Sequence, residues 1–219
     1  ADTDIRAIAA RRQAAGAALR SAADALSAKR GEAAGRLGRA VSRLLPGLGL
    51  PGGKLEIVLA PTVAPTASGQ ESVTFTVRLN VGHDAKPLAK AASGGELSRL
   101  MLALKTVLAG QDDVPTLIFD EIDAGVGGEV GTQLGEALAT VARKHQVLVV
   151  THLPQIAARS DRHLVVSKAA RGGIATSDIE VIHGEDRITE LARMLGDADA
   201  ETARKHAEAL LGGKAVSSK

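Results

Sequence analysis

The sequence predicts an α/β fold: a parallel sheet flanked by helices, with antiparallel edge strands and a helical arm in front. Two apolar runs, 116–119 and 147–150, have the continuous hydrophobic character of strands buried in a parallel sheet. A helix predicted over about 129–144 joins them. Alternating residues in 72–81 predict an antiparallel strand, and residues 1–45 have the composition of a long helix.

Composition limits the classes of function. The chain has 219 residues, 45% of them hydrophobic, which is enough for a core. A net charge of +2 does not by itself indicate nucleic acid or a membrane surface as a partner. Cysteine is absent, which excludes disulfides and thiolate metal sites and suits a reducing cytoplasm. Phe75 and Phe119 are the only aromatic residues, so any contact with DNA must be made through phosphates. Neither a signal peptide nor an apolar run near 18 residues is found, so no membrane contact is expected.

Residues 1–45 are expected to form a coiled-coil arm. Leu19, Leu26 and Ala33 recur every seven residues, which gives a narrow apolar stripe on a charged helix. The alternative is an amphipathic helix packed on its own domain, but the stripe is narrow for that role. Glycines weaken the helix, and we expect a break near Gly31. A single strand of a coiled coil needs a partner from elsewhere.

The segment from Pro46 to Lys90 is expected to hold a loop and two paired strands. Residues 55–60 and 72–81 read as antiparallel strands, joined by a flexible loop over 61–70 that contains two prolines. The alternation predicts that one face of the second strand is buried. Its members are Val73, Phe75, Val77, Leu79 and Val81.

Gly52-Gly53-Lys54 fails the test for a Walker A phosphate loop. That motif requires a glycine five residues before the second glycine and a hydroxyl after the lysine, and this chain has Leu48 and Leu55 at those positions. We therefore expect any phosphate-gripping loop to come from another polypeptide segment.

A capped helix start follows at Ser93-Gly94-Gly95-Glu96. Ser93 is a suitable N-cap, and Glu96 stands three residues later as its capping-box partner. The free N–H groups of such a first turn attract anions, and the glycines allow a phosphate to approach. The plainer interpretation is a capped surface helix.

Asp120 and Glu121 follow the first buried strand, where open α/β sheets bind ligands. The first carboxylate is a candidate for holding Mg²⁺, and the second is a candidate for orienting or deprotonating a water molecule. His152 ends the second strand, where an imidazole can meet a γ-phosphate or the attacking water. Acids that form a turn and a structural histidine are the alternatives.

The order of these segments resembles the C-terminal half of an ABC/SMC-type ATPase head. Residues 93–97 look like the ABC signature, 116–121 like Walker B with its glutamate, and His152 like the switch histidine. Three further runs, 120–128, 151–157 and 188–195, resemble the RecN family of bacterial DNA-repair ATPases, an SMC-like branch of the ABC class. The resemblance covers roughly residues 37–212.

The resemblance implies roles for these residues. Asp120 would bind Mg²⁺, Glu121 would be the general base, and His152 would sense the γ-phosphate of an ATP held by the same head. Ser93, Gly94, Gly95 and Glu96 would instead contact the ATP of a second, engaged head. A Walker A lobe of the same protein would complete the head, so this chain alone is expected to be inactive. A role in DNA double-strand break repair, in the cytoplasm and at the nucleoid, is implied with it.

One position departs from the ABC pattern. Many ABC proteins have an aspartate at the end of the loop after Walker B, where this chain has Gly127; whether Asp123 takes over part of that role is left open. Two alternatives to the RecN-like interpretation are a fragment of an ABC transporter motor domain and a non-catalytic dimerisation module. The arm and the run 120–128 disfavour the transporter.

The predicted boundaries are 1–45 for the arm, 46–212 for the head lobe and 213–219 for a disordered tail. Late in the lobe, 163–168 and 174–182 are expected to form a hairpin, and 188–195 and 202–211 amphipathic helices. Basic residues near the hairpin are candidates for DNA phosphate contacts, although a solvated rim is the plainer interpretation. They are Arg159, Arg162, Lys168 and Arg171.

Overall fold

The computed structural model describes residues 2–79, 82, 84–90, 93–111, 113–171, 174–198 and 200–212. The predicted tail at 213–219 and the end of the predicted strand at Val81 lie outside these residues. The chain divides into two compact units. The first contains residues 1–46 and 51–91, and the second contains residues 47–50 and 92–219.

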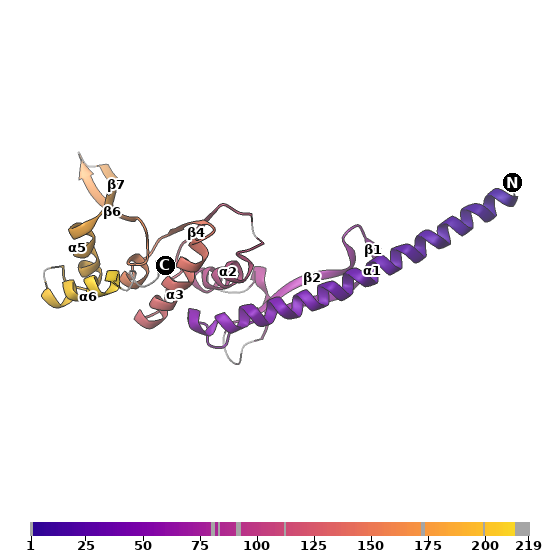
Figure 1. The fold of residues 1–219 in the computed structure, drawn as a ribbon, viewed down its shortest axis with the longest axis horizontal. Coiled ribbons are helices and arrows are strands. Elements are labelled where there is room, and N and C mark those ends of the chain that lie inside the picture. Colours follow the sequence, from indigo (N-terminus) through magenta and orange to yellow (C-terminus); the bar gives the residue numbers. More distant parts are fainter. Residues whose placement is uncertain are drawn as a thin grey trace. The chain divides into compact units, whose positions relative to one another are not determined.

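The first unit is built on one long helix, α1 (Asp2–Leu44), which Figure 1 shows as a continuous rod. The predicted break near Gly31 is therefore wrong. A single glycine costs a helix only about 1 kcal/mol relative to alanine, and alanines surround this one. Apolar residues of the N-terminal half of α1 remain exposed. They are Ile5, Ile8, Leu19 and Leu26.

Two glycines of α1 are expected to respond in opposite ways to alanine. A Cβ added at Gly31 meets nothing within 4 Å, so Gly31→Ala should stabilise the unit by about 0.5–1 kcal/mol through helix propensity. A Cβ at Gly38 would lie 2.9 Å from the backbone oxygen of Leu55, so Gly38→Ala should destabilise it by forcing the helix away from the strand. Urea denaturation of both variants measures the difference, and equal shifts of the same sign would contradict the close approach.

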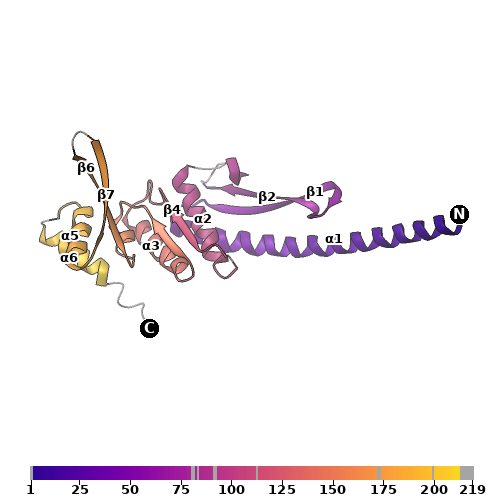
Figure 2. The same cartoon turned by 90° about the horizontal axis from the view of Figure 1, so that it is seen from above.

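A three-stranded antiparallel sheet lies beside α1, with strand order β1-β2-β3. The strands are β1 (Lys54–Thr66), β2 (Gly69–Arg78) and the short β3 (Lys86–Pro87), and η2 (Leu88–Lys90) follows. Figure 2 shows the long hairpin running along the helix. The loop predicted over 61–70 is instead mostly strand. Because β1 is an edge strand, its prolines cost no ladder hydrogen bond on the open side, although the register shifts between Pro61 and Thr66.

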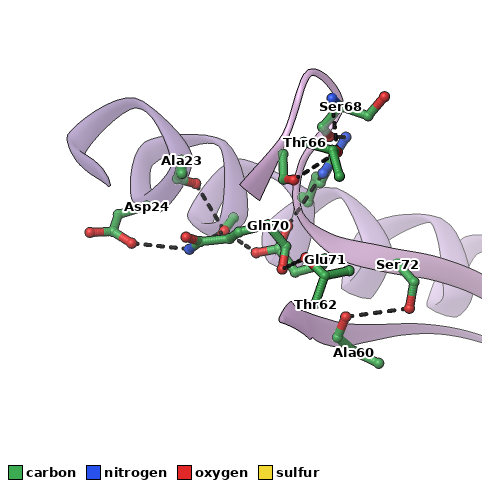
Figure 3. A network of polar contacts seen from close by, with 12 residues as sticks. Ala23, Asp24, Ala60, Thr62, Thr66, Ser68, Gln70, Glu71 and Ser72 are labelled. Atoms are coloured by element: carbon green, nitrogen blue, oxygen red, sulfur yellow. Dashed lines mark hydrogen bonds and ion pairs between the residues drawn. The ribbon is translucent and has the colours of Figure 1, made fainter. Parts of the chain in front are cut away.

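The buried apolar side chains of the hairpin lie at its base. Val77 and Leu79 are buried as predicted, whereas Val73 and Phe75 on the same face are exposed. The tip of the hairpin is held to α1 by polar groups instead (Figure 3). Gln70 donates to Asp24, Arg30 donates to the carbonyl of Ser68, and Glu71 accepts hydrogen bonds from Ser27 and Arg30.

The second unit has a two-stranded parallel sheet at its centre. Strands β4 (Thr116–Phe119) and β5 (Gln146–Val149) pair in parallel, with Phe119 opposite Val149, which confirms the predicted parallel pairing. The predicted burial is only partly right, because Ile118 and Leu148 are exposed while Leu117 and Phe119 are buried. Helices α2 (Gly94–Leu108) and α3 (Gly128–Ala142) contribute the buried residues around it. On α2 the buried residues include Leu100, Leu102 and Ala103, while Met101 is exposed.

The sequence then continues through α4 (Pro154–Ala157), the hairpin of β6 (His163–Arg171) and β7 (Ile174–Ile182), and helices α5 (Gly184–Met194) and α6 (Glu201–Gly212). Helices α4, α5 and α6 share a small core built on Ala157, Leu191 and Ala207. Arg187 of α5 fastens the turn after α4, because its Nη2 donates to the carbonyls of Ala157, Ala158 and Ser160 at 3.2, 3.1 and 2.8 Å. No helix among the described residues combines the length and apolar character needed to cross a bilayer.

Candidate functional site

The start of α2 has the capping box that the sequence predicts. The hydroxyl of Ser93 accepts a hydrogen bond from the backbone N–H of Glu96 at 3.4 Å, and the Glu96 carboxylate accepts one from the N–H of Ser93 at 3.3 Å. These bonds satisfy two of the N–H groups at this helix start. The remaining N–H groups of the first turn still give this end of the helix a partial positive charge.

Asp120, Glu121 and His152 stand at one edge of the parallel sheet. The pairing of β4 with β5 continues one step past the strands, since the N–H of Val150 donates to the carbonyl of Phe119 at 3.0 Å. Asp120 follows β4 directly, and His152 comes two residues after Val150. The carboxyl ends of adjacent parallel strands therefore deliver the acid pair and the histidine to the same edge, which is where α/β sheets bind ligands.

Glu121 has a strained backbone. Its φ is +56°, the left-handed region that costs a non-glycine residue about 1–3 kcal/mol. The N–H of Glu121 donates to Oδ1 of Asp120 at 2.8 Å, which supports this conformation. Such strain persists only where surrounding structure imposes it, and it is concentrated at functional sites.

The capped helix start and the acid pair lie against each other. A Cβ at Gly94 would collide with the carboxylate of Glu121, and one at Gly95 would lie 2.8 Å from the Glu121 carbonyl oxygen. Ser98 donates to the carbonyl of Asp120 at 2.9 Å. Gly95 of the predicted signature is therefore required first by the close approach of the backbone after β4, independently of any phosphate, whereas the flexible side chain of Glu121 can turn away from a Cβ at Gly94.

Arg99 of α2 holds the segment that follows β4 in place. The side chain is buried, and its Nη1 donates to the carbonyls of Ile122 and Ala124 at 3.2 and 3.0 Å. Burial lowers the pKa of the guanidinium from its ordinary value, while the carboxylates of Glu96 and Asp123 act in the opposite direction. Arg99 thus ties α2 to the residues on either side of Asp123.

Asp123 in turn holds the end of β5. Its Oδ2 accepts hydrogen bonds from the hydroxyl of Thr151 at 2.5 Å and from the N–H of His152 at 2.8 Å, and it lies 3.0 Å from Nδ1 of His152. The hydroxyl of Thr151 also accepts a hydrogen bond from the N–H of Leu153 at 3.0 Å, so the contact with Asp123 is linked to the next residue after His152. The segment with the histidine is therefore oriented by the segment with the acids.

The donor set fits a magnesium ion that is shared with a substrate. Mg²⁺ usually takes one or two protein carboxylates and fills its other positions with water and phosphate oxygens. Asp120 is exposed at the sheet edge, and within the described residues no group of three or more side chains forms a complete metal cage. A single carboxylate at this edge matches that use, with Asp120 as the residue that would hold the ion.

One basic residue of the predicted DNA patch already has an acidic neighbour. Arg159 donates to Glu136 of α3 at 3.4 Å. Arg162 and Lys168 are exposed, and the side chain of Arg171 lies outside the described part of the chain. A contact between these residues and DNA phosphates stays a prediction.

Sequence reasoning missed Arg99 and the partners of Asp123. The available signal for Arg99 was one arginine next to the most apolar stretch of α2, at 100–104. For Asp123 the signal was a third acid in the run 120–123, followed much later by a hydroxyl and an imidazole. Neither pattern identifies its partners, because these contacts join residues more than 20 positions apart.

The curated proteins that resemble this chain include several with the same name, DNA repair protein RecN. The chain is 46% identical over 215 residues to the DNA repair protein RecN of Streptomyces coelicolor, covering 92% of this chain and 38% of that protein. It is 41% identical over 197 residues to RecN of Deinococcus radiodurans, covering 90% and 35% respectively. The chain thus spans little more than a third of the length of these relatives. No model of a protein family matches it.

A comparison with solved structures identifies a protein with a similar fold. The chain matches the Smc head domain with a coiled coil and joint from Pyrococcus yayanosii with a TM-score of 0.51 and 23% identity. The match covers 72% of this chain and 28% of that one. The described arrangement is therefore that of part of an SMC-type head, as expected from the order of the motifs.

Proposed function

Because this chain belongs to the RecN family, we propose that it is the C-terminal lobe of an SMC-like ATPase head that acts in DNA double-strand break repair and recombination. The relatives carry the name DNA repair protein, which supports the biological role. The observation that carries the catalytic part is the sheet edge where Asp120, Glu121 and His152 follow two paired parallel strands.

At this edge each residue has a task. Asp120 would hold Mg²⁺, which would supply positive charge against the charge that develops on the phosphates. Glu121 accepts the proton of the attacking water, and His152 contacts the γ-phosphate or that water. The start of α2, with Ser93 and its glycines, offers free N–H groups to the triphosphate of a second head. ATP shared in this way holds two heads together until it is hydrolysed.

A bare sheet face supports the need for a second lobe. Ile118, Leu148 and Val150 lie on β4, β5 and just beyond, and remain 71%, 46% and 62% exposed. Parallel sheets are normally covered on both faces, because their strands are apolar on both sides. The occupant we propose is the Walker A lobe of the same protein, since this chain spans only about a third of its relatives.

The arm completes the proposal. The exposed stripe of α1, with Ile5, Ile8, Leu19 and Leu26, is the seam for the other strand of a coiled coil. DNA is contacted through its phosphates, with Arg162 and Lys168 as candidates on this lobe. We place the protein in the cytoplasm, at the nucleoid.

Reconstitution tests the proposed function. This chain alone is expected to show no ATP hydrolysis above the blank, because its sequence contains no Walker A loop to hold the β- and γ-phosphates. Addition of a separately purified Walker A lobe should produce hydrolysis that saturates with the concentration of that lobe. Turnover by this chain alone, after removal of contaminating ATPases, would contradict the assignment of the missing half.

A further inference from the structure

Asp123 is a buried acid, unlike the solvated acids of a protein surface. It retains 3% of its accessible surface, and the three groups around its Oδ2 all belong to Thr151 and His152. A hydroxyl and a backbone N–H donate to this oxygen, so it acts as an acceptor. The group 3.0 Å away, Nδ1 of His152, must then present a hydrogen toward it.

We propose that Asp123 is a positioning residue for hydrolysis, which fixes the ring of His152 with its proton on Nδ1 and its Nε2 directed to the reacting groups. The side chain of His152 is 71% exposed, so packing does little to restrain its rotation. The contact with the buried carboxylate supplies the restraint that packing does not.

The proton on Nδ1 decides what the other nitrogen does. In the neutral ring Nε2 carries a lone pair and accepts a hydrogen bond, which suits the attacking water. In the protonated ring Nε2 donates, which suits a phosphate oxygen, and the carboxylate of Asp123 then balances the charge. In both forms Asp123 keeps the same edge of the ring turned away from the substrate.

The position of Asp123 is itself determined by α2. Arg99 binds the carbonyls on both sides of it, those of Ile122 and Ala124. A continuous set of hydrogen bonds therefore leads from the helix with the predicted signature, through Asp123, to the histidine. This explains why an acid is useful at position 123 without any contact to a second head.

The test reads the tautomer directly. Two-bond ¹H–¹⁵N correlations of the imidazole, recorded on this chain where the ring is neutral, distinguish Nδ1–H from Nε2–H, and the variant His152→Gln identifies the signals. We expect Nδ1–H to be the major form in the native chain. Asp123→Ala should shift the ring to Nε2–H, whereas Thr151→Val, which removes only the neighbouring hydroxyl, should leave Nδ1–H in place.

Each outcome is decisive. A native ring that is mainly Nε2–H, or an Asp123→Ala ring that remains Nδ1–H, would overturn the proposal. The native spectrum decides even if Asp123→Ala does not fold. The role in hydrolysis depends on the proposed function, but this measurement needs neither nucleotide nor a second lobe, so the two ideas fail separately. In the reconstituted ATPase, Asp123→Asn should lower kcat about 10–100-fold with little change in KM, by analogy with groups that orient metal-bound histidines; a change confined to KM would contradict it.

Discussion

Glu121→Gln is expected to lower ATP hydrolysis by the reconstituted head at least about 100-fold, while ATP still binds and engaged heads accumulate. The reason is that a positioned general base typically contributes a factor of about 10²–10⁴, and an amide does not accept the proton. Glutamine has the size of glutamate and the same backbone cost at φ +56°, so the fold should not change. Single-turnover hydrolysis and the mass of the complex with ATP measure the two effects.

Glu129→Gln is the matched control, because Glu129 is an exposed acid in the first turn of α3. It removes the same charge from the same lobe without touching the sheet edge, and its kcat should remain near that of the native head. If Glu121→Gln turned over at the native rate, Glu121 would not be the base. If both variants lost activity equally, the loss would reflect net charge instead.

Ile118→Asp is expected to abolish assembly with the Walker A lobe while leaving this chain folded. Ile118 is 71% exposed here, so the change should alter the free energy of unfolding by no more than about 0.5 kcal/mol. In the complete head the same side chain would be covered, and burial of an unpaired carboxylate costs several kcal/mol. Since about 1.4 kcal/mol is a factor of ten, affinity for the lobe should fall about 100-fold or more.

Two further substitutions serve as controls for Ile118→Asp. Leu117→Asp places the same charge on the opposite, buried side of β4 and should unfold the unit outright. Ile118→Val retains an apolar face and should preserve the affinity. Circular dichroism and titration with the lobe separate folding from assembly. Normal binding by Ile118→Asp would mean that the bare face is not where the second lobe lies.

The sequence predicted the structure correctly where the interacting residues are close together in the sequence. Ser93 and Glu96 are three residues apart, and both partners of the capping box are contained in that spacing. The apolar runs at 116–119 and 147–150 indicated β4 and β5, and their parallel pairing follows from the helix between them.

Tertiary contacts explain where the sequence misled. Residues 61–66 contain Pro61 and Pro65 and read as a loop, but pairing with β2 makes them an edge strand. Gly31 read as a break, yet the helix around it is continuous. Among the described residues of the face predicted for 72–81, only Val77 and Leu79 are buried.

In the candidate site, too, local features could be predicted from the sequence and tertiary contacts could not. The types of residue at the sheet edge and their order could be read from the sequence, because Asp120, Glu121 and His152 lie within three residues of the ends of recognisable strands. The groups that orient them could not. Arg99 and Asp123 act through partners brought close only by the fold, and a buried charge with distant partners leaves no periodic pattern in a sequence.

The structure of this chain bound to the Walker A lobe and a non-hydrolysable ATP analogue is the most direct measurement. We predict a metal ion on the Asp120 carboxylate, a water within about 2.6–3.2 Å of Glu121, and the ring of His152 directed at the γ-phosphate. A triphosphate bound away from this sheet edge, with the acids and the histidine in solvent, would contradict the assignment of the lobe as half of an ATPase.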